Sequence, residues 1–167
     1  MDSYVLSRIL IDGALLTAGL TIVILVSLSY NPRLWLQDFP AEIKAVVPPL
    51  SAKEKRDRWV VAVFFFGIAI GVIVYSVAQL RAHFGGPVPF LTTFVTIFGV
   101  YSVFNLFDAI VLDLGLMTFM KPSFAVLPGA EGMEYLYHNW GMHFTNFLKG
   151  VVFSALLALP VALIAAL

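Results

Sequence analysis

Residues 97–122, IFGVYSVFNLFDAIVLDLGLMTFMKP, decide how this chain can fold. The stretch is apolar over a length that suits a membrane-spanning helix, yet it contains Asn105, Asp108 and Asp113. A helix needs ~20 predominantly apolar residues to cross a hydrocarbon core of ~30 Å. Ionisable groups are costly in such a segment, so they are candidates for a functional site.

The composition of the whole chain is that of an integral membrane protein. Of its 167 residues, 60% are hydrophobic and 12% are charged, whereas a soluble domain is about half apolar and a quarter charged. The apolar runs show no period-two alternation, so the predicted spans are helices and not the strands of a barrel. We therefore predict an all-α integral membrane protein. It is a four transmembrane helix bundle with amphipathic interfacial helices in its two long connections.

Four apolar runs and their connections use the full length as one transmembrane domain. The first run is longer than a signal-peptide core, so we interpret it as a retained span. The small residues Ser27 and Ser29 leave cleavage as an alternative. Gly85-Gly86-Pro87 predicts a tight turn between the second and third spans. The expected spans cover about 9–29, 59–80, 90–117 and 147–167, and the long connections cover 31–58 and 118–146.

The first long connection carries clear helix signals. Pro40 can open a short helix over 41–47, which Pro48-Pro49 would close. Ser51 and Glu54 have the spacing of a capping box, which marks the start of a new helix. This helix is expected to continue directly into the second span.

Small residues recur every four positions in the first, second and fourth spans, which predicts close helix packing. Gly67 and Gly71 form a GxxxG pair in the second span. We expect this pair to pack inside the monomer, with a dimer interface as the alternative. The fourth span carries a longer ladder, made of Gly150, Ser154, Ala158 and Ala162.

The basic residues predict the orientation of the chain in the membrane. Eight of the ten lie in or beside the two long connections, and Arg8 and Arg81 lie on the other side. Basic residues favour the cytoplasmic side, so we expect both connections inside and both termini outside. The densest cluster is expected to set topology and to contact lipid head groups; it consists of Lys53, Lys55, Arg56 and Arg58.

Helix geometry suggests where the acidic residues lie. If the third span enters the core at Phe90, Asp108 lies ~27 Å along the helix, near the cytoplasmic boundary, and Asp113 lies ~35 Å along it. At ~100° per residue the two carboxylates point ~140° apart, so one α-helix cannot direct both at a single centre. One interpretation is structural: the acids pair with Lys121, Lys149 or the basic cluster. The other is a metal or acid–base site completed by the connection 121–146.

That second connection supplies the remaining candidates. The catalytic candidates are Asp108, Asp113, Glu134, His138 and His143. The candidate metal ligands are Glu131, Glu134, His138 and His143, of which Glu134 and His138 are four residues apart, as ligands on one helical face would be. Neither HExxH nor an EF-hand loop is present. His83 is expected at the opposite end from the other histidines, so no haem pair forms and no cofactor is predicted.

Two stretches resemble a known group of proteins. They are NPRLWLQDFP at 31–40 and FNLFDAIVLDLGLMTFMKPSFAVLPGAEGM at 104–133. They resemble small bacterial four-span integral membrane proteins of unknown function, over about the central two-thirds of the chain. The resemblance implies the number of spans and a bacterial inner membrane. It implies no activity and no functional residue.

These observations favour a non-enzymatic membrane subunit, or a partner- or lipid-binding protein, of the bacterial inner membrane. The alternative is a membrane-embedded enzyme that acts on a lipid-like substrate at the cytoplasmic interface through Asp, Glu and His. A second alternative is an oligomeric transporter or channel component. Its pathway would form only between copies of the chain, because the expected centre of a single bundle holds no charge. The expected partners are membrane lipids and, in addition, other membrane subunits or further copies of the chain. Ten basic and ten acidic residues cancel, so no nucleic acid is expected.

Overall fold

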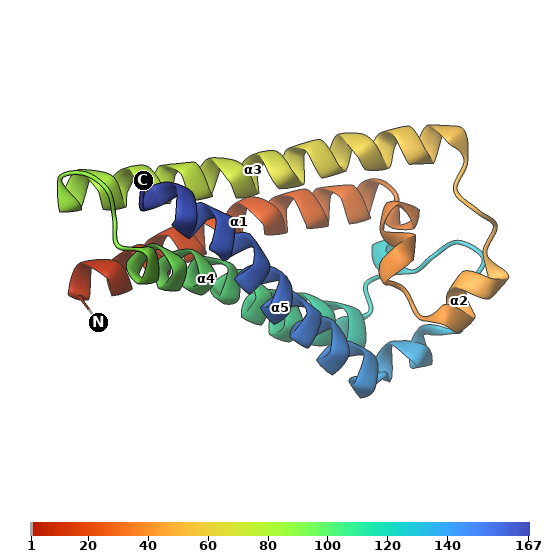
Figure 1. Ribbon diagram of the computed structural model, residues 1–167. Coiled ribbons are helices and arrows are strands. Elements are labelled where there is room, and N and C mark those ends of the chain that lie inside the picture. The colour runs from red at the N-terminus through yellow and green to blue at the C-terminus, as the bar shows by residue number, and fades with distance from the viewer. Residues whose placement is uncertain (1) are drawn as a thin grey trace.

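A computed structural model describes residues 2–167, and it is helical throughout with no strand in that range (Figure 1). Four helices are long and apolar enough to cross a membrane, which confirms the predicted fold class. Short helices fill the two long connections. The long helices are α1 (Ser3–Tyr30), α3 (Ala52–Phe84), α4 (Phe90–Phe107) with its continuation η2 (Asp108–Met120), and α5 (Trp140–Ala165). The short ones are η1 (Pro32–Asp38), α2 (Ala41–Val46), η3 (Ser123–Ala125) and η4 (Glu134–His138).

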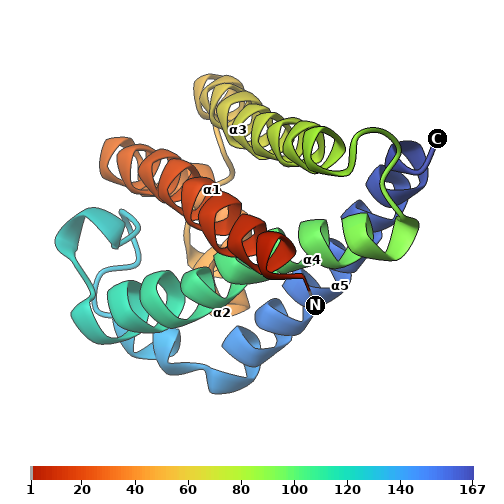
Figure 2. The same ribbon diagram turned by 90° about the vertical axis from the view of Figure 1, so that its left-hand side faces the viewer.

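The helices are arranged as an open bundle in which α1 lies between α3 and α4, and α5 crosses α4 (Figures 1 and 2). Both termini and the α3–α4 turn lie at one end, and both long connections lie at the other. Glycines let α1 and α4 approach closely. A Cβ atom on Gly13 would lie 2.8 Å from the Cβ of Val103, and one on Gly99 would lie 2.9 Å from Ile9.

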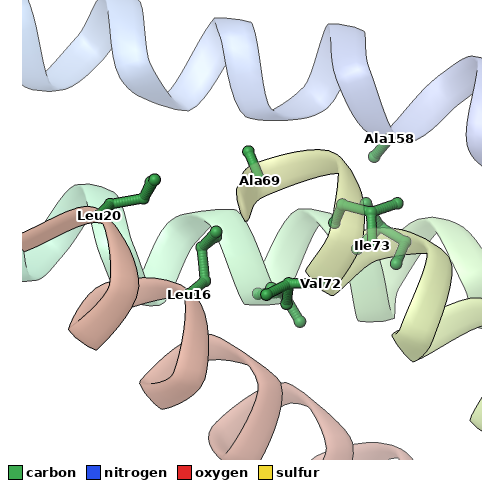
Figure 3. Close-up of a cluster of buried hydrophobic side chains, with 8 residues drawn as sticks. Leu16, Leu20, Ala69, Val72, Ile73 and Ala158 are labelled. Carbon is green, nitrogen blue, oxygen red and sulfur yellow. The ribbon is translucent and has the colours of Figure 1, made fainter. Parts of the chain in front are cut away.

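The apolar core is built where α1, α3 and α5 meet around α4 (Figure 3). Leu16 is fully buried, and Ala158 of α5 is equally inaccessible. Within a membrane such contacts stabilise the bundle through van der Waals packing, because lipid tails are as apolar as the side chains themselves. The labelled side chains in this core are Leu16, Leu20, Ala69, Val72, Ile73 and Ala158.

The predicted helix signals of the first connection are confirmed. The short helix α2 starts directly after Pro40 and ends before the Pro48-Pro49 pair. In the capping box, the Glu54 amide donates to Ser51 Oγ over 3.2 Å, and the Ser51 amide donates to the Glu54 carboxylate over 2.8 Å. At the other end of α3, Gly85 has a φ of 73°, the left-handed conformation that terminates a helix.

The second connection folds differently from the expected single interfacial helix. Its aromatic stretch divides into the short 3₁₀-helix η4 and the first turns of α5. The division falls at Asn139, whose side-chain oxygen accepts from the Met142 amide at 3.0 Å and so caps α5. The fourth long helix therefore starts at Trp140, seven residues before the expected position.

The two sets of small residues have different surroundings. In α5, Gly150 packs directly against the Asn105 side chain, and Ser154, Ala158 and Ala162 are buried. In α3, Gly67 and Gly71 are exposed, and nothing lies within 4 Å of a Cβ atom placed on either. The expectation that this GxxxG pair packs inside the monomer is therefore wrong, because α3 turns that face away from its neighbours.

At the end of the bundle that carries the termini, α1 contains a buried ion pair. The Arg8 guanidinium donates through Nε and Nη2 to the Asp12 carboxylate, as their spacing of four residues predicts. Asp12 is fully buried, and the Arg8 guanidinium also lies 5.1 Å from the centre of the Tyr75 ring. This carboxylate thus has its counter-charge supplied by its own helix.

Candidate functional site

The third long helix changes its hydrogen-bonding pattern at Asp108. From there to Met120 it is a π-helix, η2, in which each amide bonds five residues back. Residues five apart therefore share one face, and Asp108, Asp113 and Thr118 have this spacing. Thr118 Oγ1 donates to the Asp113 carbonyl over 2.9 Å along this face. The expectation that Asp108 and Asp113 point ~140° apart is wrong, because it assumed α-helical geometry throughout.

The face that carries the two aspartates borders a cavity of about 320 Å³ at the end where the connections lie. It is enclosed by the end of α1, by η1 and the two residues after it, by η2, by η4 and by the start of α5. Its apolar and aromatic walls come from Ile24, Leu28, Trp35, Phe39, Pro40, Leu112, Leu116, Met117, Tyr137 and Met142. Its polar groups are Asp38, Asp108, Asp113, His143, Asn146 and Lys149.

His143 is held at the cavity wall by its ring nitrogens. It is 7% exposed, and its Nε2 lies 2.7 Å from the Tyr137 carbonyl oxygen. A carbonyl oxygen only accepts hydrogen bonds, so Nε2 carries a proton. The other nitrogen, Nδ1, lies 3.6 Å from Asp113 Oδ2 and has no hydrogen-bond partner. Because Nε2 already carries a proton, one further proton can bind to the His143 ring or to the Asp113 carboxylate. The first case gives an imidazolium–carboxylate pair, and the second gives a neutral histidine beside a neutral acid.

Asp108 differs from Asp113 in having no partner. In residues 2–167 its carboxylate makes no hydrogen bond and no ion pair. The charged groups that act on it are themselves acidic, Asp38 and Asp113. The expected pairing of Asp108 and Asp113 with Lys121, Lys149 or the basic cluster is not found. Within the described chain, η1 is joined to α3 instead by Arg33 Nε, which lies 2.6 Å from the Glu54 carboxylate.

The third carboxylate at the cavity, Asp38, comes from the end of η1. Partial removal from water raises its pKa, and the nearby Asp113 carboxylate adds to the rise. The Gln37 amide, which donates to Asp38 over 2.9 Å, acts in the opposite direction. Asp38 therefore brings a further acidic group to the side of the cavity formed by the first connection.

The other predicted site residues lie elsewhere. Glu131 accepts from the Gly129 amide over 3.0 Å, and Glu134 accepts from the Gly132 amide over 3.1 Å, so both acids stabilise turns. His138 packs edge-on against Phe119, with ring centres 6.4 Å apart. These residues do not border the cavity, whereas Asp108, Asp113 and His143 do. Across residues 2–167, no three His, Asp or Glu side chains are close enough to hold a metal ion.

Sequence reasoning missed several residues of this site. Asp38 and the aromatic residues Trp35, Phe39 and Tyr137 reach the cavity because the two connections fold against each other. The rings of Phe39 and Tyr137 meet edge-on with centres 5.8 Å apart. Thr118 was also missed, although its spacing of five residues from Asp113 repeats the spacing of Asp108 and Asp113. That period of five was the available signal.

The arrangement combines an apolar and aromatic wall with a histidine–carboxylate pair, two further carboxylates, Asp108 and Asp38, and the amine of Lys149. Such a cavity can hold the polar end of an amphiphilic molecule and can exchange a proton with it. The chain matches no protein-family model, no curated protein and no solved structure.

Proposed function

We propose that this membrane protein binds an amphiphilic molecule, with the polar end of the ligand in the cavity that Asp108 and Asp113 border. The observation that supports this proposal is the composition of the cavity wall. Leu28 and Leu112 line it together with Asp108, Asp113 and His143. A wall that offers both apolar and polar side chains matches a molecule with an apolar chain and a polar end.

The proposal includes a location at the cytoplasmic face of a bacterial inner membrane. The cavity lies at the end of the bundle where both long connections meet, and those connections hold most of the basic residues. Basic residues concentrate on the cytoplasmic side, so both termini face outward in this orientation. Lys53, Lys55 and Arg56 are exposed near the start of α3, where they can contact anionic lipid head groups.

Trp35 provides a test, because it borders the cavity and its Nε1 donates to Ser27 Oγ over 2.8 Å. The other two tryptophans, Trp59 and Trp140, are exposed and are replaced by phenylalanine to leave Trp35 alone. In micelles of a maltoside detergent, a brominated amphiphile should quench Trp35 with a saturable dependence on its mole fraction. A protein that keeps only Trp59 is the control for simple contact with the detergent. Proportional quenching of both proteins would contradict the proposal.

A second candidate function is favoured by the Asp113–His143 pair. A histidine whose Nδ1 faces a carboxylate at 3.6 Å can take up or release a proton at a bound molecule, as a general acid–base catalyst does. In this version the protein is an enzyme acting on the same amphiphile. His143→Gln should then abolish conversion of lipid extracts while saturable quenching of Trp35 persists. Conversion that survives this substitution would contradict catalysis by His143, and no conversion by the parent protein would leave binding as the function.

A further inference from the structure

The electrostatics of the cavity indicate the charge of its ligand. Asp113 faces His143 Nδ1 at 3.6 Å, so this carboxylate has beside it a group that can carry the opposite charge. Asp108 has no ion-pair partner within residues 2–167, although Lys149 also borders the cavity, and the charges that act on it are those of Asp113 and Asp38. A carboxylate in apolar surroundings with no counter-ion is costly to keep charged. A cation in the cavity would remove that cost.

His143 shows that the cavity is a built site and not a chance group of acids. Its side chain is more than nine-tenths buried, and its Nδ1 has no hydrogen-bond partner although it borders the cavity. Buried polar atoms normally have partners. With the proton on Nε2, Nδ1 is an acceptor whose nearest polar group is the Asp113 carboxylate at 3.6 Å, so the partner it lacks is a donor supplied from outside. The position of Nδ1 is fixed, because Nε2 is bonded to the Tyr137 carbonyl.

The aromatic residues around the cavity suit a cation as well. Trp35, Phe39 and Tyr137 all border it, and each comes from one of the two connections. An aromatic ring face attracts a cation within ~6 Å of its centre, and cages of such rings recognise quaternary ammonium groups. Among residues 2–167, no set of ligands for a metal ion is present here. Carboxylate and aromatic groups together therefore favour an organic cation over a metal.

We propose that the ligand is a cationic amphiphile, with an ammonium group beside Asp108 and the aromatic rings and an apolar chain along α1 and η2. This inference rests on the proposed function and specifies its ligand class. Asp108 supplies the counter-charge, and Trp35, Phe39 and Tyr137 surround the ammonium substituents. Ile24 and Leu112, which line the same cavity, contact the first part of the chain.

The test compares three amphiphiles that share one brominated twelve-carbon chain and differ in head group: trimethylammonium, uncharged glucoside and sulfate. Each is titrated into the protein that keeps only Trp35, in maltoside micelles at fixed salt. We expect the trimethylammonium compound to bind at least about tenfold more tightly than the other two, because only it can pair with Asp108. Tetramethylammonium chloride should displace it, and sodium chloride at the same ionic strength should not.

Asp108→Asn distinguishes binding of the cation at Asp108 from a general effect of the charge of the ligand. The change keeps the shape of the side chain and removes an uncompensated charge, so the protein should fold normally. It should weaken binding of the trimethylammonium compound about tenfold or more and leave binding of the glucoside unchanged. Glu42→Gln is the matched control, since Glu42 is an exposed acid on α2 that does not border the cavity. This control should bind as the parent does.

The outcomes distinguish the two proposals. Saturable and equal binding of all three compounds would overturn the cationic ligand and leave the proposed function standing. Binding of the trimethylammonium compound that survives Asp108→Asn would also overturn it, as would displacement by sodium chloride. If none of the compounds binds saturably, the proposed function itself fails. Selective binding that is lost in Asp108→Asn and retained in Glu42→Gln would establish both.

Discussion

Asp12 and Asp108 are two carboxylates in apolar helices near opposite ends of the bundle, and the fold treats them differently. Asp12 is fully buried, and Arg8, one helical turn away, donates two hydrogen bonds to it. Asp108 is partly buried at a cavity wall and has no basic partner in residues 2–167. The first has what a buried charge needs for stability, and the second lacks it.

The comparison suggests how to separate structural from functional acids in a membrane protein. The sequence context of the two residues is similar, because each interrupts an apolar helix. Their surroundings separate them: a complete ion pair at Asp12 and an open cavity with acidic neighbours at Asp108. The variants below test that separation, from the largest expected effect to the smallest.

Removing the partner of Asp12 should have the largest effect. Arg8→Met keeps an apolar stem of similar length and leaves the Asp12 carboxylate buried without a counter-charge. The free energy of unfolding should fall by about 3–5 kcal/mol, measured by denaturation in detergent micelles. The double variant Arg8→Met with Asp12→Leu is the control and should recover most of this loss, because both charges are then gone.

Gly150→Ala tests the packing of α5 against α4. A Cβ atom on Gly150 would overlap the Asn105 side chain, which donates to the Phe147 carbonyl over 3.1 Å. The substitution should cost about 1–3 kcal/mol in the free energy of unfolding. Gly67→Ala is the matched control, because nothing lies within 4 Å of its Cβ position. It should stabilise α3 by up to about 1 kcal/mol. Equal effects of the two changes would contradict this account of the packing.

Removing the charge of Asp113 should change the free energy of unfolding by an amount between those expected for the Asp12 ion pair and for Asp108. It faces His143 across 3.6 Å, but its side chain is 31% exposed, so solvent weakens the pair. Asp113→Asn should therefore lower the free energy of unfolding by at most about 1 kcal/mol. The same denaturation measurement checks it. A loss as large as that of Arg8→Met would place Asp113 with the structural acids.

Asp108→Asn should have the smallest effect on stability. No group in residues 2–167 loses a hydrogen bond or an ion pair when the charge is removed. We expect the free energy of unfolding to stay within about 0.5 kcal/mol of the parent value or to rise. Thermal and chemical denaturation of the ligand-free protein check this. A loss of more than about 1 kcal/mol would show that Asp108 has a structural partner.

The sequence was sufficient for the architecture, because apolar length, prolines and caps act locally. The four long helices, the helix after Pro40, the Ser51–Glu54 capping box and the turn at Gly85 all follow from short-range rules. The same short-range rules predicted less of the site. Asp108 and Asp113 were singled out from the sequence, and both border the cavity. Their common face was missed, because a change from α- to π-helix alters the hydrogen-bonding pattern without a characteristic residue.

Other parts of the site depend on contacts between distant segments. Trp35 and Tyr137 come from different connections, and no local pattern shows that those connections enclose one cavity. The exposure of Gly67 and Gly71 was missed for the same reason, since a GxxxG pattern does not say which helix, if any, lies opposite. Local rules give the elements, and the pairing of distant elements has to come from the structure.

The cavity is completed late in the synthesis of this chain, because its lining residues come from segments that are synthesised one after another. Chains emerge from the N-terminus, so α1 and η1, which carry Ile24 and Trp35, are synthesised first. Asp108 and Asp113 follow with the third long helix, and His143 follows with the fourth. Until that last helix has inserted, Asp113 has no histidine beside it. The wall of the cavity is therefore complete only after the chain has been synthesised as far as Lys149.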